Sequence, residues 1–313
     1  MIVTNKTDTL KGCIFHIIHG SFVDGFGVRT TIFLKGCPLR CLWCCNPEGQ
    51  ERQLEIKLTT SKCNDCGNCV EICPKKAITL NKKPGEPKVV INRKLCDNCG
   101  KCMDVCYTGA IEYFGKMMTV DEVFDIVKKD ENYYRMSGGG VSIGGGEPTF
   151  QSEFTYALLR KCKDNYIHVA IDTCGYTTDA LGIKILEEAD LLLWDIKGME
   201  AEGHLINTGV SNSRILDNLK HVSDLGVPVI IRMPILPHYN DSMQNIKDTA
   251  EFLSKLKSIV RVDILPYHKF GIVKYEQLEK KYELGNLDTP PQEHIDEIIS
   301  IFERHGLKAQ IGG

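Results

Sequence analysis

The stretch GCPLRCLWCCNPE, residues 36–48, places three cysteines at a C-x3-C-x2-C spacing directly after the β-branched run TTIFLKG. A 4Fe-4S cube has four irons, so three thiolates from Cys37, Cys41 and Cys44 leave one iron with an open position, which a small bidentate molecule can bind. A structural zinc site is the alternative. Such a site is closed by four ligands, and the adjacent Cys45 is poorly placed to supply the fourth. The spacing therefore predicts a catalytic iron-sulfur cluster at the end of a strand.

Beyond residue 119, apolar runs alternate with amphipathic stretches, which is typical of repeated βα units around a parallel sheet. The expected strands are VSIGG, IHVAID, DLLLWDI, VPVIIRMPI and VRVDILPY, which begin at positions 141, 167, 190, 227 and 260. Expected helices begin near positions 153, 178, 213 and 241. With TTIFLKG this gives about six βα units. We predict an α/β fold, a partial (β/α)6 TIM-like barrel that falls short of eight units.

Residues 57–115 interrupt this rhythm, because they hold eight cysteines and no helix of useful length. They contain a weak repeat, CNDCGNCVEICPKKAI and CDNCGKCMDVCYTGAI. Each copy has the C-x2-C-x2-C-x3-C spacing of bacterial two-cluster ferredoxins, in which the fourth cysteine of a run serves the other cluster. We therefore predict an inserted ferredoxin-like domain with two 4Fe-4S clusters, in a barrel made of residues 1–56 and 116–313. One cluster is assigned to Cys63, Cys66, Cys69 and Cys106, and the other to Cys96, Cys99, Cys102 and Cys73.

The composition argues against several functions. The chain of 313 residues has a net charge of -3 and no long Lys/Arg run, so nucleic acid is not an expected partner. Residues 1–12 are polar, and the apolar run after them is too short for a signal sequence or a membrane span, so we expect a cytoplasmic protein without a membrane partner. In that compartment, 15 cysteines indicate metal ligation more than disulfides. Four cysteines are left over as small buried side chains: Cys13, Cys45, Cys162 and Cys174.

The cysteine loop, with Trp43 before its last cysteine, resembles the radical S-adenosylmethionine superfamily. The resemblance implies that the methionyl group of S-adenosylmethionine chelates the open iron, and that reductive cleavage yields a 5'-deoxyadenosyl radical. The longer stretch SFVDGFGVRTTIFLKGCPLRCLWCCNPE, residues 21–48, resembles the opening of the glycyl radical enzyme activating enzymes, DGPGxRTTxFxxGCxLxCxWCxNPE. Those enzymes abstract hydrogen from a backbone glycine of a protein partner. The tandem insert is similar to that of activases for decarboxylase, dehydratase or lyase partners.

The resemblance also assigns residues. The segment SIGGGEPTF matches a GGE segment that receives the methionyl ammonium, and the segments DTCGY and DIK match others that face the amino-acid part of the cofactor. Their two aspartates are implicated in a monovalent cation site. Arg232 suits the cofactor carboxylate as a bidentate donor, His268 matches a position near the ribose, and Asp24 matches one that meets the partner's glycine loop. The expected cofactor-binding residues are Trp43, Cys45, Gly145, Gly146, Glu147, Asp172, Thr173, Asp195, Ile196, Lys197, Arg232 and His268.

Three positions depart from the pattern: Phe26 replaces a proline, Gly144 a serine, and Cys45 a His or Ala. The leading hypothesis is an activase with three 4Fe-4S clusters that depends on a low-potential reductant such as flavodoxin or ferredoxin. Two alternatives stay open at this point. One is a radical enzyme that acts on a small molecule, and the other is an electron carrier with a non-catalytic barrel.

Overall fold

The computed structural model describes residues 10–81, 89–285 and 287–312, so parts of both predicted domains, residues 1–9 and 82–88, lie outside the described residues. Its main element is a nine-stranded sheet in the order β13-β12-β11-β10-β9-β8-β2-β1-β7. Seven neighbouring strands pair in parallel: β2, β8, β9, β10, β11, β12 and β13. At the β2 edge, β1 pairs antiparallel with β2, and β7 pairs antiparallel with β1. Their bounds are β1 Lys11–Ser21, β2 Arg29–Leu34, β7 Lys116–Thr119, β8 Gly140–Gly145, β9 Val169–Thr173, β10 Leu191–Asp195, β11 Val229–Ile235, β12 Ile259–Pro266 and β13 Ala309–Ile311.

All six strands expected from the apolar runs are present, which confirms the parallel sheet. Three further strands were not predicted. β13 has three residues that are partly or fully exposed, so it leaves no apolar run in the sequence. β1 and β7 pair with each other through Lys11–Ile14. Both lie outside the part of the sequence with the βα rhythm, since β1 precedes β2 and β7 directly follows the module. No pairing joins β13 to β7 within the described ranges, so the barrel is open.

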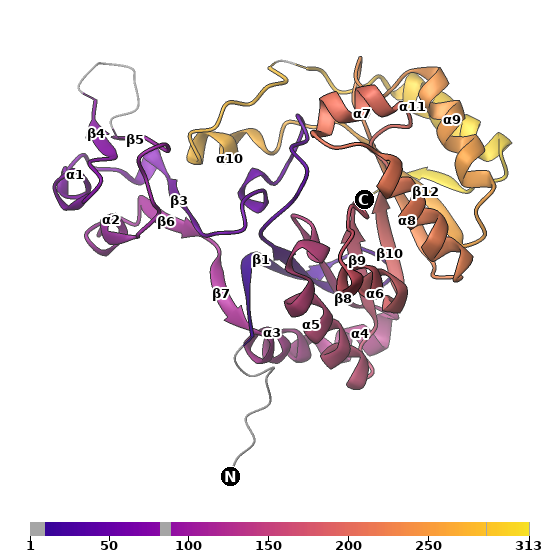
Figure 1. Ribbon diagram of the computed structural model, residues 1–313, viewed down its shortest axis with the longest axis horizontal. Coiled ribbons are helices and arrows are strands. Elements are labelled where there is room, and N and C mark those ends of the chain that lie inside the picture. The colour runs from indigo at the N-terminus through magenta and orange to yellow at the C-terminus, as the bar shows by residue number, and fades with distance from the viewer. Residues whose placement is uncertain (1–9, 82–88, 286, 313) are drawn as a thin grey trace, which may run out of the picture.

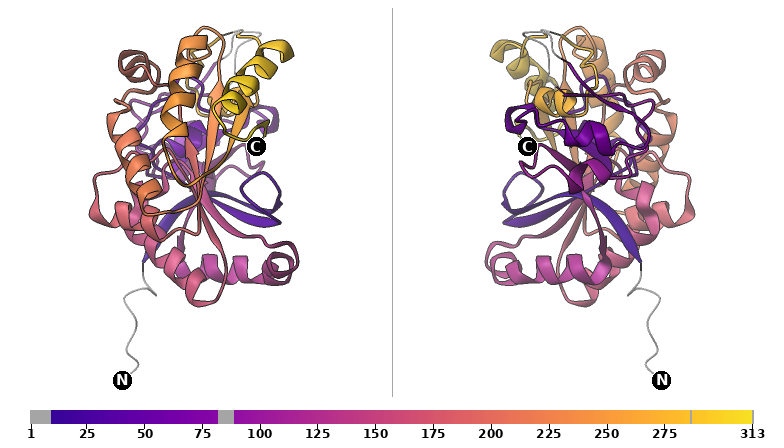
Figure 2. Two further views of the ribbon diagram at one scale, coloured as in Figure 1. Left: turned by 90° about the vertical axis from the view of Figure 1, so that its right-hand side faces the viewer. Right: turned by 90° about the vertical axis from the view of Figure 1, so that its left-hand side faces the viewer.

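Helices lie on the outside of this curved sheet, as Figure 2 shows for the magenta to yellow segments. They are amphipathic: α11, for example, buries Ile295, Ile298 and Phe302 in the main core. The helix after β7 begins with a reciprocal capping box between Thr119 and Glu122. Among the described residues, no helix has the length and apolar character needed to cross a membrane. The bounds are α3 Val120–Val127, α4 Glu131–Ser137, α5 Ser152–Asp164, α6 Ala180–Glu188, α7 Ala201–Thr208, α8 Ser213–Asp224, α9 Met243–Ser254, α10 Ile272–Gln277 and α11 Gln292–Arg304.

The cysteine-rich insert forms a small module to one side of the barrel, with α10 between the two (Figure 1). In the described part of the module, the core is a separate cluster of eight buried residues and is far smaller than that of the barrel. The first strand of the module starts at Glu55, two residues before the limit predicted from sequence. Its elements are β3 Glu55–Leu58, α1 Asn68–Ile72, β4 Ile78–Leu80, β5 Val89–Ile91, α2 Lys101–Asp104 and β6 Ile111–Phe114.

Candidate active site

A cavity of about 600 Å³ opens at the carboxyl ends of the parallel strands, the edge at which barrel enzymes keep their sites. Its volume is in the range of small-molecule sites. The cavity brings together segments from Val23 to Gly312, so it draws on nearly the whole chain. The predicted residues that line it are Asp24, Cys37, Cys41, Trp43, Cys44, Cys45, Gly145, Gly146, Asp172, Thr173, Asp195, Lys197, Arg232 and His268.

The three-cysteine loop follows β2 and is held by its backbone. The N–H of Gly36 donates to the carbonyl of Gly49 at 2.7 Å, and the N–H of Leu42 donates to the carbonyl of Asn207, at the end of α7, at 3.0 Å. These bonds fix the loop at the mouth of the cavity. Cys37, Cys41 and Cys44 are free thiols, and all three line the cavity.

Burial raises the pKa of all three thiols, that of Cys44 to about 11. An unbound thiolate is therefore unfavourable at this position, whereas a positively charged metal centre stabilises it. Three thiols that come from one short loop and line one cavity match the ligand number of a 4Fe-4S cube with one open iron. The iron-binding role of these cysteines stays a prediction that this geometry supports.

The GGE segment packs directly onto the cysteine loop. The N–H of Gly146 donates to the carbonyl of Leu34, and a Cβ at this glycine would lie 2.2 Å from the carbonyl oxygen of Gly36. Glycine is thus required because the two backbones approach so closely. At Gly144, a Cβ would lie 2.9 Å from the Cβ of Asp172, so the departure from the family's serine matches the tight packing here. The result is an exposed stretch of backbone at the cavity wall beside the cysteines.

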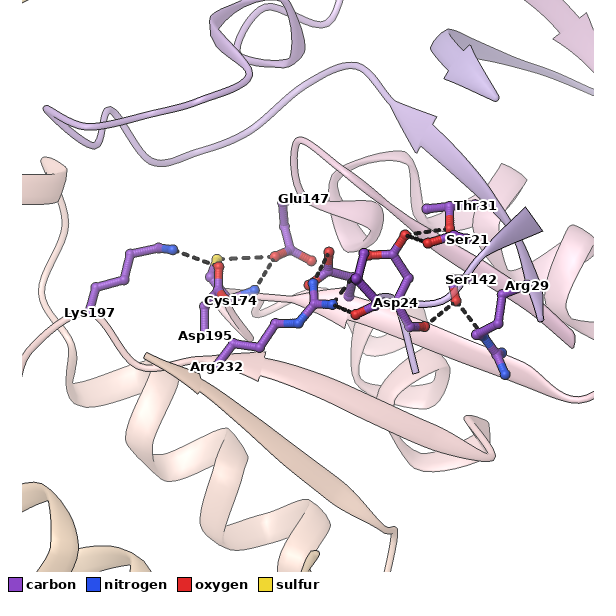
Figure 3. A network of polar contacts seen from close by, with 12 residues as sticks. Ser21, Asp24, Arg29, Thr31, Ser142, Glu147, Cys174, Asp195, Lys197 and Arg232 are labelled. Carbon is purple, nitrogen blue, oxygen red and sulfur yellow. Dashed lines mark hydrogen bonds and ion pairs between the residues drawn. The ribbon is translucent and has the colours of Figure 1, made fainter. Parts of the chain in front are cut away.

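Glu147 lies behind this wall, and the structure differs here from the sequence-based expectation. Its side chain is fully buried and does not line the cavity. Its carboxylate accepts hydrogen bonds from the N–H and hydroxyl of Thr149, the hydroxyl of Thr173, and the N–H and thiol of Cys174, all between 2.8 and 3.1 Å. Direct contact with a cofactor ammonium does not fit a carboxylate that is already satisfied by protein donors. Glu147 instead holds Thr173 and Cys174, which line the cavity, and Figure 3 shows its contact with Cys174.

Ile196 is also placed away from the cavity. Its side chain is buried in the barrel core, and its backbone N–H donates to the carbonyl of Arg232 at 2.9 Å. The residue therefore joins β10 to β11. It contributes to the site through the position of its neighbours Asp195 and Lys197 and not through its own side chain.

Arg232 lies between two carboxylates (Figure 3). Its guanidinium donates to Asp172 at 3.1 Å, to Asp24 at 3.2 Å and to the carbonyl of Val23 at 2.5 Å. Its Nε is buried and has no hydrogen-bond partner within the part of the chain that the structure describes. The side chain of Arg232 also lines the cavity, so its guanidinium can attract an anionic group of a ligand.

The two carboxylates beside Arg232 behave differently. Burial raises the pKa of Asp172 to about 7, against the opposing charge of Arg232. Burial also acts to raise the pKa of Asp24, but hydrogen bonds from Thr31 and Ser21 and the charge of Arg232 outweigh it and lower that pKa. Asp172 is therefore the carboxylate that gains most from a cationic ligand.

Lys197 and Asp195 form an ion pair of 2.6 Å at the end of β10. Burial acts to lower the pKa of Lys197, but the negative groups around it, Asp195 first and then Cys41 and Cys174, raise it well above its usual range. A lysine that stays charged near Cys41 favours the thiolate form of that cysteine. His268, which also lines the cavity, stacks on Phe270 with ring centroids 4.4 Å apart.

Sequence reasoning missed several lining residues. Cys174 was expected to be an inert buried side chain; it is buried, but it also lines the cavity and donates to Glu147. Asn46 and Leu236 line the cavity as well. The sequence indicates Asn46 and Cys174 only through neighbouring motifs. Asn46 lies in the NPE segment that ends the cysteine loop, and Cys174 directly follows Asp172 and Thr173.

The module contains two further pockets, each lined by four cysteines. The first, which we call the lysine pocket, contains Cys73, Cys96, Cys99 and Cys102. The second, the neutral pocket, contains Cys63, Cys66, Cys69 and Cys106. Each set combines three cysteines of one repeat with the fourth of the other, which is the grouping predicted from the ferredoxin pattern. That the pockets hold 4Fe-4S cubes stays a prediction.

Two family models match the chain: the radical SAM superfamily over residues 104–253, and a 4Fe-4S dicluster domain over residues 62–110. The structure of Streptococcus suis SuiB bound to precursor peptide SuiA has a similar fold, with a TM-score of 0.55 and 16% identity, over 93% of this chain and 50% of that one. The fold, the cysteine loop at the carboxyl end of its sheet and the dicluster module define a radical S-adenosylmethionine enzyme.

Relatives of similar length narrow the class. The trans-4-hydroxy-L-proline dehydratase activating enzyme of Clostridioides difficile is 41% identical over 307 residues, which cover 97% of this chain and 98% of the relative. The isethionate sulfite-lyase activating enzyme of Oleidesulfovibrio alaskensis is 39% identical and covers 88% and 90%. A 4-hydroxyphenylacetate decarboxylase activating enzyme of Clostridioides difficile is 36% identical and covers 97% and 96%. The chain belongs to the family of glycyl radical enzyme activating enzymes.

Proposed function

We propose that this enzyme uses the 600 Å³ cavity to cleave S-adenosylmethionine reductively and to abstract hydrogen from a backbone glycine of a dehydratase, decarboxylase or lyase. One observation carries the proposal. The backbone at Gly145 and Gly146 lies against the three-cysteine loop, and the side chain of Arg232 lines the same cavity. A methionyl group with one ammonium and one carboxylate matches a site with backbone acceptors, a carboxylate of raised pKa and a buried guanidinium.

The residues of the chain divide the work. Cys37, Cys41 and Cys44 would hold the cube, which supplies one electron to the sulfonium when bound. Asp172 would accept a hydrogen bond from the ammonium, since burial without a cation disfavours its charged form. Arg232 would place its positive charge beside the carboxylate, while Asp24 and Asp172 keep the guanidinium oriented.

The rest of the cavity wall excludes water and faces the partner. Leu39, Leu236 and Leu265 line the cavity with apolar surface, which limits quenching of a reactive radical by solvent. Val23 and Asp24 lie at its rim, in the turn that we expect to meet the partner's glycine loop. Phe26, in place of the family's proline, is stacked under the guanidinium of Arg261 at 5.3 Å. This contact offers the turn a support that does not depend on proline.

Two finer assignments belong to the same proposal. Asp172 and Asp195 both line the cavity, and the charge of Asp195 helps to raise the pKa of Asp172, so a monovalent cation between them would relieve the repulsion. The pockets of the module would hold two more cubes, which gives three clusters in total, supplied with electrons by a low-potential reductant such as flavodoxin or ferredoxin.

Electron paramagnetic resonance tests the function. The reconstituted, reduced protein is mixed anaerobically with S-adenosylmethionine and each candidate glycyl radical enzyme from the same genome. We expect a glycyl doublet with one partner and none when Cys41→Ser replaces the enzyme. Deoxyadenosine release without a doublet from any partner, together with consumption of a small substrate, would overturn the proposal in favour of small-molecule chemistry.

A further inference from the structure

The lysine pocket and the neutral pocket differ in charge. Lys75 and Lys101 line the lysine pocket together with a single carboxylate, Asp97, which pairs loosely with Lys75 at 3.8 Å. The neutral pocket is lined by apolar side chains and by the polar, uncharged Asn64 and Thr108. Nearby ammonium groups stabilise the reduced and more negative state of a cube. Of the two cubes, the one in the lysine pocket therefore accepts an electron more readily.

The lysine pocket also lies on the side of the module that faces the barrel. Ile56 and Ile91 line it, and the N–H of Ile91 donates to Glu279, just after α10, at 2.9 Å. The neutral pocket is lined instead by Leu58, two residues after Ile56 on β3, and by Val89, two residues before Ile91 on β5. Along β3 and β5, the lysine pocket is thus the one nearer to α10.

The α10 segment continues the connection to the three-cysteine loop. The ammonium of Lys274 donates to the side chain of Asn46, two residues after Cys44, at 2.7 Å and pairs with Glu48 at 2.7 Å. Gly271 packs so closely on this loop that a Cβ there would lie 2.9 Å from the Cα of Cys45. A short series of direct contacts therefore joins the lysine pocket to the radical-generating site.

The outer side of the lysine pocket is open to a partner. Cys99 is exposed, and so are Lys76, Lys94 and Leu95, which neighbour the cysteines of this pocket in sequence. The charge of the chain is unevenly divided: residues 57–115 hold ten Lys and Arg against six Asp and Glu, while the remaining residues hold 28 against 35. An acidic protein is attracted to the module and repelled by the barrel.

We propose that the surface around the lysine pocket, formed by Lys75, Lys76, Lys94, Leu95 and Lys101 and here called the donor face, docks a small acidic electron-carrier protein of low potential. The inference rests on the proposed function. Cys73, Cys96, Cys99 and Cys102 would hold the cube that takes one electron from the carrier, and Cys37, Cys41 and Cys44 would hold the cube that delivers it to the sulfonium. One electron enters each cube and one leaves it, so both cubes would return to their starting oxidation state.

The test uses the full chain with all clusters and an acidic flavodoxin as the probe. The variant Lys76→Glu/Lys94→Glu reverses two exposed charges that do not line the pocket. The matched control, Lys220→Glu/Lys247→Glu, makes the same change in net charge on exposed positions of α8 and α9. We expect the first variant to bind flavodoxin about tenfold more weakly or worse at low salt, and the control to bind as the parent does.

A second readout separates docking from catalysis. Deoxyadenosine release driven by flavodoxin hydroquinone should slow by a similar factor in the donor-face variant, whereas release driven by dithionite should not change. Equal flavodoxin binding by the donor-face variant and the control variant would overturn the assignment of the donor face as the docking site. Loss of dithionite-driven release in the parent protein would instead count against the proposed function itself, so the two failures can be told apart.

The unaltered protein offers a check that does not depend on the fold of a variant. A carbodiimide joins carboxylates of bound flavodoxin to nearby lysines, and peptide mass spectrometry identifies the sites. Crosslinks at Lys75, Lys76, Lys94 or Lys101 that disappear at high salt are the expected result, because exposed charges are screened within about 10 Å at 0.1 M salt. Crosslinks confined to lysines of the barrel would contradict the proposal.

Discussion

The barrel cavity and the cysteine-rich module are two metal-binding regions with opposite designs. The cavity collects residues from Val23 to Gly312 and rests on a large apolar core. Both pockets of the module are built from residues between Ile56 and Ile111, around a core of eight buried residues in the described part of the module. A large core holds a site in shape without its metal, and a small one does not. The comparison predicts that the barrel cavity needs metal for chemistry but not for folding, and that the cysteine-rich module needs metal in order to fold.

The largest effect is expected from Cys41→Ser. The change removes one of three ligands, so the enzyme should lose about four irons, a quantity set by the cube, and its entire rate enhancement, about 10⁶-fold or more. Deoxyadenosine release and iron content measure the loss. Cys45→Ser is the matched control. Cys45 is not an expected iron ligand, so this variant should keep the full iron content of the enzyme. Retention of full activity in Cys41→Ser would refute the assignment.

Removal of all iron should separate the two regions. With a chelator and a reductant, we expect backbone hydrogen exchange to rise to nearly unprotected rates in the described parts of residues 57–115, while β8 to β11 stay protected. The physical reason is that the small core of the module alone cannot offset its conformational entropy. Equal protection in both regions after iron removal would show that the module does not need its cubes to fold.

Arg232→Ala probes the ionic layer of the cavity. The change leaves Asp24 and Asp172 buried without their shared cation, so the free energy of unfolding of the barrel should fall by about 3 to 5 kcal/mol. Urea denaturation followed by tryptophan fluorescence measures it, because Trp194 is fully buried in the barrel core. Arg160→Ala, which removes the solvent-exposed ion pairs of Arg160 with Asp164 and Glu188, should cost about 1 kcal/mol or less. Equal losses in both variants would contradict a buried ionic layer.

The effect that is smallest per unit of change concerns pH. Burial raises the pKa of Asp172 from 3.8 to about 7 in the folded chain, so folding favours its protonated form. Its contribution to stability is therefore complete below about pH 4 and is lost as the pH rises to about 7, with a slope of at most roughly 1.4 kcal/mol per pH unit. Asp172→Asn should remove this slope from the cluster-free protein. An unchanged pH profile in that variant would mean that another group is responsible.

Much of this organisation could be predicted because its signals are local. The cysteine spacings predict the three thiol groupings, and continuous apolar runs predict six parallel strands. The role of Glu147 could not be predicted in this way. Its donors Thr173 and Cys174 come from another strand, and only the fold shows that they satisfy its carboxylate. For the same reason, the sequence did not indicate that Asp24 and Asp172 share Arg232, since the three residues lie far apart in the chain.

The central claim is that the radical formed in the cavity is directed at a protein backbone. The most direct test uses a glycyl radical enzyme whose glycines carry deuterium at Cα, mixed anaerobically with the reduced activase and S-adenosylmethionine. The account predicts one deuterium in the released 5'-deoxyadenosine, together with a glycyl radical on the partner. Deoxyadenosine that stays free of deuterium while S-adenosylmethionine is consumed in the presence of the correct partner would contradict it.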